Sequence, residues 1–161
     1  MSGLSHPATA AAVLQAGRND PLPEQTDAAA FERARSYRTA DGHCEALGIE
    51  LVDIGLGRAT LCMRVAEQHM NFHRACHGGA IFSLADTAFG MAANAYGVMA
   101  VGIDAHITYQ AAARFGDVLE AKAHEVSRSR RLAIYRVDVT RTNAAGETAL
   151  VSSFTGTVYI K

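Results

Sequence analysis

The feature that most constrains the fold is an apolar stretch between Gly78 and Gly97, in which Asp86 is the single charged residue. Its larger apolar side chains recur at helical spacing, and small residues occupy many of the positions between them. A helix this apolar and this slim is normally surrounded by protein. No apolar run approaches the roughly 20 residues that a membrane span needs. The stretch therefore predicts a buried central helix in a protein without a membrane partner.

The segments on both sides of this helix alternate apolar and polar residues, as strands do. Residues 47–55 and 58–65 form one such pair, with Gly55 and Gly57 as turn residues between them, which predicts a hairpin. Four further strands are expected at about 99–109, 117–127, 131–142 and 147–160. These strands follow one another too closely for helical crossovers, so the sheet should be mainly antiparallel. The fold class is α+β.

The chain divides into two unequal parts. Its 161 residues suffice for one ordinary domain. Residues 1–45 are rich in alanine and contain all three prolines, and a weak helix capped by Thr26 is expected over 26–38. We therefore predict a partly helical extension at 1–45 and a folded domain at 46–161.

Charge and cysteine content narrow the class of protein. Fifteen basic and sixteen acidic residues give a formal net charge of −1, so nothing drives the whole chain toward nucleic acid or an anionic membrane. The three widely spaced cysteines do not suggest a disulfide framework, and the first residues do not resemble a secretory signal. A cytoplasmic protein is expected.

The residues suited to chemistry lie between Asn71 and Thr87. Gly78 and Gly79 precede the helix, where unpaired N–H groups and the helix dipole can hold a developing oxyanion. The alternative is a simple tight turn. Asp86 shares its helix face with small polar residues rather than with other charges, which favours a functional carboxylate over an exposed surface one.

The spacing of these groups has a geometric consequence. Asp86 lies seven residues beyond Gly79, which is about 10 Å along a helix axis. Both groups cannot touch one carbonyl from the same helix. A shared site would require a second copy of the chain with its helix antiparallel, as a two-fold dimer provides.

Two other clusters are candidate binding sites. His69, His73 and His77 have metal-ligand spacing on a helix, but the glycines after them indicate a loop, so no metal is expected. The run from Ser127 to Arg131 is a basic turn between two strands. It is either a solvated hairpin tip or a clamp for phosphates. Nucleic acid is disfavoured because no aromatic residues interleave with the basic ones.

The stretch CHGGAIFSLADTAFGMAANAYG resembles the signature of the hotdog-fold acyl-CoA thioesterases, specifically the PaaI-type branch of phenylacetic acid degradation. The resemblance covers about residues 45–161. It implies the hotdog fold, in which a long central helix is wrapped by a curved antiparallel sheet of five to six strands. It also implies a homodimer or homotetramer with active sites at the subunit interface.

The resemblance further implies a reaction and a set of site residues. The reaction is hydrolysis of an acyl-CoA to a free acid and CoA, with coenzyme A only as part of substrate and product. Asp86 would attack the carbonyl or activate a water, the Gly78 N–H would hold the oxyanion, and Asn71 and His77 would complete the catalytic group. The substrate-binding residues would be Gly79, Ser83, Thr87, Arg128, Arg130 and Arg131.

The acyl group stays open between an aryl-acetyl group, such as phenylacetyl or a hydroxylated derivative, and a medium-chain one. Many members carry a Phe-Leu-Arg-Pro run after the third strand, where this chain has residues 107–113, Ile-Thr-Tyr-Gln-Ala-Ala-Ala. The alternative functions are a non-catalytic hotdog protein that binds acyl-CoA and an acyl-CoA hydratase.

Overall fold

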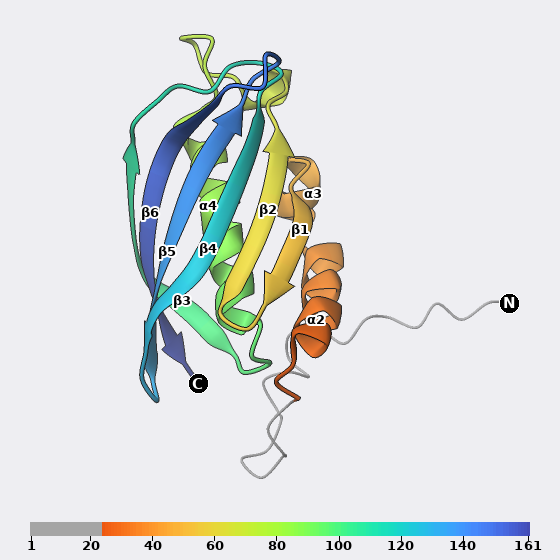
Figure 1. The fold of residues 1–161 in the computed structure, drawn as a ribbon, viewed down its shortest axis with the longest axis vertical. Coiled ribbons are helices and arrows are strands. Elements are labelled where there is room, and N and C mark those ends of the chain that lie inside the picture. The colour runs from red at the N-terminus through yellow and green to blue at the C-terminus, as the bar shows by residue number, and fades with distance from the viewer. Residues whose placement is uncertain (1–23) are drawn as a thin grey trace, which may run out of the picture.

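The computed structural model describes residues 24–161, in which a six-stranded antiparallel sheet curves around a long helix (Figure 1). The strand order is β1-β2-β4-β5-β6-β3. The predicted α+β hotdog fold is confirmed, and each expected strand is present. The elements are β1 Glu50–Gly55, β2 Arg58–Arg64, α4 Gly78–Asn94, β3 Ala100–Tyr109, β4 Val118–Arg128, β5 Leu132–Thr142 and β6 Thr148–Ile160.

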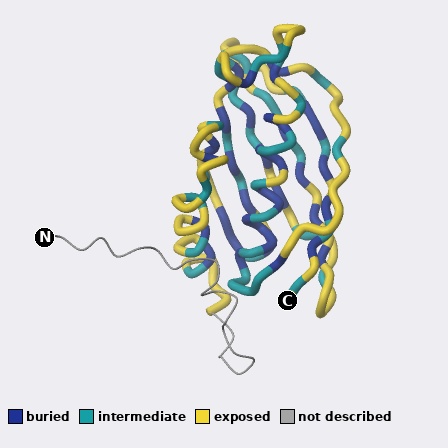
Figure 2. Tube along the Cα trace, turned by 180° about the vertical axis from the view of Figure 1, so that it is seen from behind, coloured by how far each residue is buried: buried dark blue, intermediate teal, exposed yellow. Residues whose placement is uncertain are grey.

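The core lies between α4 and the concave face of the sheet, where both elements are buried (Figure 2). Phe89 of α4 packs edge-on against Tyr135 of β5 and tilted against Phe154 of β6, with ring centroids 5.7 and 5.5 Å apart. The helix approaches β6 closely at Gly156, where an added Cβ would lie 2.9 Å from the Phe89 ring. The alternation of small and large residues thus allows the sheet to wrap the helix tightly.

The first strand begins later than its sequence pattern indicates. We expected a strand from residue 47, but residues Gly42–Ala46 form a short helix, α3, and β1 starts at Glu50. The Asp41 carboxylate caps α3 by accepting from the backbone N–H groups of His43 and Cys44, at 2.9 and 3.1 Å. This cap and the left-handed turn at Gly48 override the apolar alternation. The one-turn helix η1, Glu67–His69, was also not predicted.

A further helix, α2 (Asp27–Ala40), covers the β1 edge of the sheet (Figure 1). As expected, Thr26 caps it by accepting from the Ala29 N–H at 3.2 Å. Asp27 fastens it to the β1–β2 turn by accepting from the Leu56 N–H and from Arg58, both at 2.9 Å. The described part of the extension therefore packs on the domain. The rest of the predicted extension, including the prolines at 7, 21 and 23, lies outside the described residues.

The opposite edge of the sheet is open. Within residues 24–161, β3 pairs with β6 alone, and nothing covers its other side. Val101 and Ile103 are 44% and 59% exposed there, and a bulge interrupts the pairing between Gly102 and Asp104. An uncovered edge with exposed apolar side chains is a surface for strand pairing with another chain.

Candidate active site

The first turn of α4 presents an unpaired backbone donor. His77 caps the helix, and its Nδ1 accepts from the Gly79 N–H at 2.8 Å while its carbonyl accepts from Ala80 and Ile81. None of the hydrogen bonds within residues 24–161 uses the Gly78 N–H. This N–H therefore remains available, with the positive end of the helix dipole behind it.

Tyr109, at the end of β3, is a site residue that the sequence analysis missed. Its hydroxyl donates to the Gly78 carbonyl at 3.0 Å, and its ring lies so close that an added Cβ at Gly78 would be 3.2 Å away. Tyr109 falls in the segment 107–113, which departs from the family's run. Nothing local in the sequence marks it, because the contact joins residues 31 positions apart.

Asn71 lies beside Gly78 in a tight loop. Its side-chain oxygen accepts from the backbone N–H groups of His73 and Ala75, at 2.9 and 3.2 Å. Arg74 takes a left-handed conformation in this loop, with φ of 58°. The oxygen is thus occupied, and the side-chain amide of Asn71 has no partner for its N–H groups among residues 24–161.

These residues share a cavity of about 340 Å³, which we call the Gly78 hollow. Its walls include Asn71, Gly78, Ile81 and Tyr109. The structure thus brings together two of the predicted catalytic residues, Asn71 and Gly78, both with N–H groups to offer. Such a pair of donors suits a carbonyl oxygen that gains negative charge.

Asp86 lies in the middle of α4, away from this hollow. Within the described residues, no group donates a hydrogen bond to its carboxylate. Asp86 is exposed in the single chain, yet partial burial by the surrounding protein raises its pKa above the ordinary value of 3.8. A carboxylate without donors is a better proton acceptor than a solvated one.

Two hollows flank Asp86. The first, of about 420 Å³, is called the α2 hollow, and its walls include Tyr37, Asp41, Asp86, Met91 and Met99. The second, of about 430 Å³, is called the β3 hollow, and its walls include Asp86, Phe89, Gly102, Ile103 and Asp104. Gly78 and Asn71 line neither of them. Within one chain, the carboxylate and the carbonyl-binding donors are therefore separate.

Ser83 and Thr87 lie on the same face of α4 as Asp86, but their hydroxyl protons are used locally. Ser83 donates to the Gly79 carbonyl at 2.9 Å, and Thr87 donates to the Ser83 carbonyl at 2.7 Å. Gly79 itself must stay small, because an added Cβ would lie 2.9 Å from Nδ1 of His77. The substrate-binding roles given to these three residues stay predictions.

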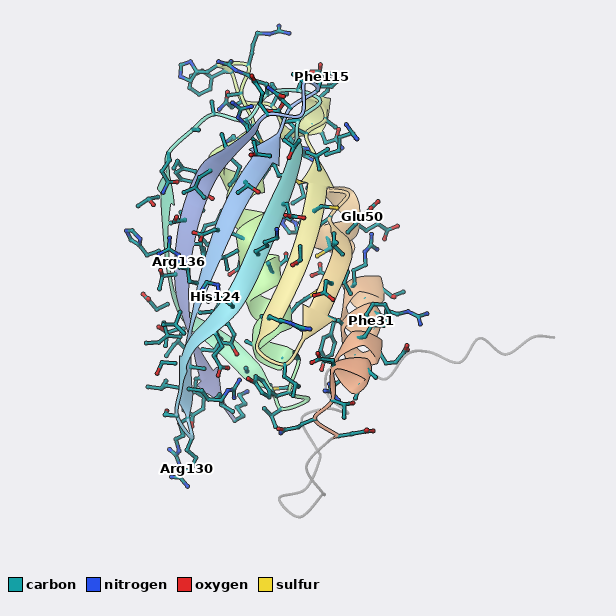
Figure 3. All side chains as sticks on the ribbon, in the orientation of Figure 1. Phe31, Glu50, Phe115, His124, Arg130 and Arg136 are labelled. Atoms are coloured by element: carbon teal, nitrogen blue, oxygen red, sulfur yellow. The ribbon has the colours of Figure 1, made fainter. Side chains whose placement is uncertain are left out.

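The three predicted arginines have different surroundings. Arg128 is part of an internal network: it donates to Glu125 at 2.7 Å and to the Tyr135 hydroxyl at 3.0 Å, and it lies 3.9 Å above the Tyr96 ring. Arg130 and Arg131 are exposed in the turn between β4 and β5. This turn is at the end of the sheet opposite Phe115 and the Asn71 loop (Figure 3). A single chain does not bring these arginines to the Gly78 hollow.

The remaining candidate reactive groups are a thiol near the site and possible metal ligands. Burial raises the pKa of the Cys76 thiol to about 11, so it stays protonated beside His77 at neutral pH. Across residues 24–161 no group of three or more His, Cys, Asp or Glu side chains is placed to hold a metal ion. In the same part of the chain, no helix is long and apolar enough to cross a bilayer.

Comparisons with known proteins show which family and which solved structures this chain is similar to. The family model of the thioesterase superfamily matches residues 75–146. The acyl-coenzyme A thioesterase PaaI of Escherichia coli K12 is 34% identical over 110 residues, which are 68% of this chain and 79% of that protein. The solved structure of E. coli PaaI, from the phenylacetic acid degradation operon, aligns over 84% of this chain and 95% of its own, with a TM-score of 0.78 and 31% identity.

A mutant of the phenylacetic acid degradation protein PaaI of Thermus thermophilus is 39% identical and aligns over 74% of this chain and 98% of its own, with a TM-score of 0.68. Fold, family match and relatives together define a hotdog-fold thioester hydrolase. The chain belongs to the thioesterase superfamily, in its PaaI-type branch, as the resemblance predicted.

Proposed function

We propose that this enzyme hydrolyses acyl-CoA thioesters to coenzyme A and a free carboxylic acid. The observation that carries the proposal is the unpaired Gly78 N–H beside the Asn71 amide, at the positive end of the helix that also bears Asp86. The similarity to the acyl-coenzyme A thioesterase PaaI supports CoA as the thiol component. The acid product is aryl-acetic or of medium chain length.

The chemistry follows from the charges that each group can carry. The thioester oxygen accepts from the Gly78 N–H, which stabilises the negative charge that forms when water attacks. Asp86 acts as the general base: it takes one proton from the water as the water oxygen bonds to the carbonyl carbon. The carbon–sulfur bond then breaks, and the CoA thiolate leaves and takes up a proton. The raised pKa of Asp86 and its lack of donors support this role.

The complete site is shared between two copies of the chain. Gly78 and Asp86 line different hollows of one chain, so each needs its counterpart from a neighbour. The open edge of β3 runs antiparallel to α4 (Figure 1). A second copy that pairs along this edge by a two-fold axis would place its α4 antiparallel to the first. Two equivalent sites would form, in a dimer or a dimer of dimers.

The same two-fold axis would explain the position of the basic turn between β4 and β5. Arg130, in this turn, lies at the end of the sheet opposite the start of α4 (Figure 3). In the proposed dimer this end would lie near Gly78 of the neighbouring chain. The guanidinium groups of Arg130 and Arg131 suit the phosphates of CoA at the rim of the shared site.

The experiment that tests the activity is thiol release, detected with DTNB, from a panel of acyl-CoA esters. Wild type is compared with Asp86→Asn, which keeps the shape and removes the base. We expect release by wild type that is lost in the variant. Equal release by both would contradict the role of Asp86, and no release from any ester by wild type would indicate an acyl-CoA-binding protein instead.

Complementation tests the shared site. Asp86→Asn and Gly78→Ala chains, each nearly inactive alone, are refolded together at equal concentration. If each site takes Gly78 from one chain and Asp86 from the other, half of the dimers are mixed and one of their two sites is intact, which restores about a quarter of wild-type activity. Sites built within one chain would restore none.

A further inference from the structure

The helical segment before the first strand reaches the site. Tyr37, near the end of α2, and Asp41, the cap of α3, both line the α2 hollow together with Asp86. Neither residue belongs to the segment whose sequence resembles the family. The wall that they form is therefore an unassigned part of the active site.

This wall is held in place by contacts between α3 and the polar face of α4. Nε2 of His43 lies 3.0 Å from the Ser83 hydroxyl. The Cys44 thiol donates to the Asp41 carboxylate at 3.2 Å, and its sulfur lies 3.7 Å from the Thr87 hydroxyl oxygen. Cys44 is fully buried. These contacts fix the position of Asp41, the cap of α3, relative to α4, so this side of the hollow has a defined shape.

The walls of the α2 hollow suit an acyl group rather than CoA. Met91 and Met99 line it with flexible thioethers, which pack well against aromatic rings, and Tyr37 adds an aromatic ring of its own. Among its described lining residues none is cationic, so the phosphates of CoA would find no partner. The volume of about 420 Å³ is at the small end for ligand pockets, which fits a compact group.

The hollow also carries negative charge. Although burial opposes it, hydrogen bonds from Cys44 and His43 hold the pKa of Asp41 below its ordinary value, so Asp41 is ionised at neutral pH. Asp86 must also be ionised to act as a base. Two carboxylates in one hollow repel an acyl group that carries a carboxylate of its own.

We propose that Tyr37 and Asp41 are specificity-determining residues that select a neutral, aromatic acyl group in the α2 hollow. Tyr37 provides the surface for the ring, and Asp41 excludes acyl groups with a terminal negative charge. This inference rests on the proposed acyl-CoA thioesterase activity and assigns the acyl end of its substrate.

The aromatic preference is tested with two CoA esters of eight carbons, phenylacetyl-CoA and octanoyl-CoA. We expect Tyr37→Leu to lower the ratio of their kcat/KM values, phenylacetyl over octanoyl, by about tenfold. Phe31→Leu is the matched control, because Phe31 is a similarly exposed aromatic residue on α2 that does not line the hollow (Figure 3). The control should leave the ratio unchanged.

The charge selection is tested with succinyl-CoA and its neutral isostere, 4-methylpentanoyl-CoA. Asp41→Asn keeps the oxygen that caps α3 and removes the charge. We expect it to raise kcat/KM for succinyl-CoA relative to the isostere by about tenfold. Asp27→Asn is the matched control, because it removes a capping-region carboxylate from α2 that lies outside the hollow.

The outcomes separate this inference from the activity on which it rests. Hydrolysis by wild type with ratios that stay within about twofold in a variant overturns the role given to that residue, while the thioesterase activity stands. A control variant that shifts the ratio as strongly as its partner overturns the inference as well. Hydrolysis of no ester by wild type overturns both proposals.

Discussion

The two ends of the proposed chemistry differ in how the protein holds them. At the start of α4, His77, Gly79 and Tyr109 hydrogen-bond around Gly78 and leave one backbone N–H free. In the middle of the same helix, Asp86 receives no hydrogen bond within the described residues, and its pKa is raised. The first region holds a hydrogen-bond donor, the Gly78 N–H, in a fixed position. The second region holds a carboxylate, Asp86, that accepts no hydrogen bond within the described residues.

This difference fits the proposal that one helix contributes to two sites. A donor must be fixed before the negative charge forms, whereas a base must not be occupied by other donors. Gly78 meets the first requirement and Asp86 the second. They lie about 12 Å apart along α4, because eight residues separate them and each adds 1.5 Å. In the proposed dimer, antiparallel pairing of two such helices would place each donor opposite a base.

The largest expected effect comes from the base. Asp86→Asn should lower kcat by about 10³-fold, because proton abstraction from water is lost. Since no hydrogen bond to Asp86 is lost, the variant should keep its fold and show an equal or higher Tm at pH 7. Thiol-release kinetics and thermal unfolding check both expectations, and a low Tm would mean that Asp86 has a structural role.

The donor should be nearly as sensitive. Gly78→Ala adds a Cβ 3.2 Å from the Tyr109 ring, which must displace either the ring or the helix start. We expect kcat to fall by about 10²-fold, as for the loss of one oxyanion donor. Gly42→Ala is the control, because a Cβ there meets nothing within 4 Å. Wild-type turnover in Gly78→Ala would remove this region from the mechanism.

The pH dependence tests whether Asp86 acts as a base. Because its pKa is raised, kcat/KM should fall about tenfold per pH unit on acidification, beginning above pH 3.8. The sign for stability is opposite to that of a paired carboxylate: ionisation of Asp86 costs stability as the pH rises from 3.8 through the folded-state pKa. The gain in Tm of Asp86→Asn over wild type should therefore be larger at pH 7 than at pH 3. A pH profile flat down to 3.8 would contradict this view.

A variant of Asn71 can distinguish its structural role in the loop from its proposed role as a hydrogen-bond donor beside Gly78. Asn71→Asp keeps the oxygen that accepts from His73 and Ala75, and it removes the amide donors. We expect an unchanged Tm and a loss of about tenfold in kcat/KM, because one donor is replaced by a repelling carboxylate. A large drop in Tm would show instead that Asn71 mainly holds the loop.

The arginines should show the smallest effects on catalysis. Arg130→Ala with Arg131→Ala should raise KM for acyl-CoA by about threefold, less so at high salt, with kcat unchanged. Arg128→Ala should instead lower Tm, because the Glu125 carboxylate, which also accepts from the Tyr135 hydroxyl at 2.7 Å, loses its cationic partner. An unchanged KM in the double variant at low salt would remove the turn from substrate binding.

Much of the fold could be predicted because its signals are local. The helix starts at Gly78 as expected and ends at Asn94, three residues before the end of the apolar stretch. Strands β2 to β6 lie within one residue of their expected bounds, since period and turn residues lie within each segment. The exception is β1, where the cap at Asp41 and the turn at Gly48 produce α3 instead of an earlier strand start. Short polar interactions here outweigh an apolar alternation of only a few residues.

The candidate site was predicted only as far as its motif extends. Asn71, Gly78 and Asp86 belong to one continuous stretch of sequence, so their spacing and order were visible. Tyr109 and Tyr37 were missed, because they line the Gly78 hollow and the α2 hollow from β3 and α2, far from the motif in the sequence. The substrate-binding role of Arg128 stays a prediction. Its pairing with Glu125, a contact that depends on the course of β4, was not predicted.

The sequence by itself determined the central helix, the antiparallel strands around it and the separation of Gly78 from Asp86 along the helix axis, because periodicity and helical rise act within a segment. The tertiary structure alone decided which side chains surround each of these groups. It also decided that β1 is covered by α2 while β3 stays open within the described residues. Such choices depend on packing between segments far apart in the chain, which no local pattern encodes.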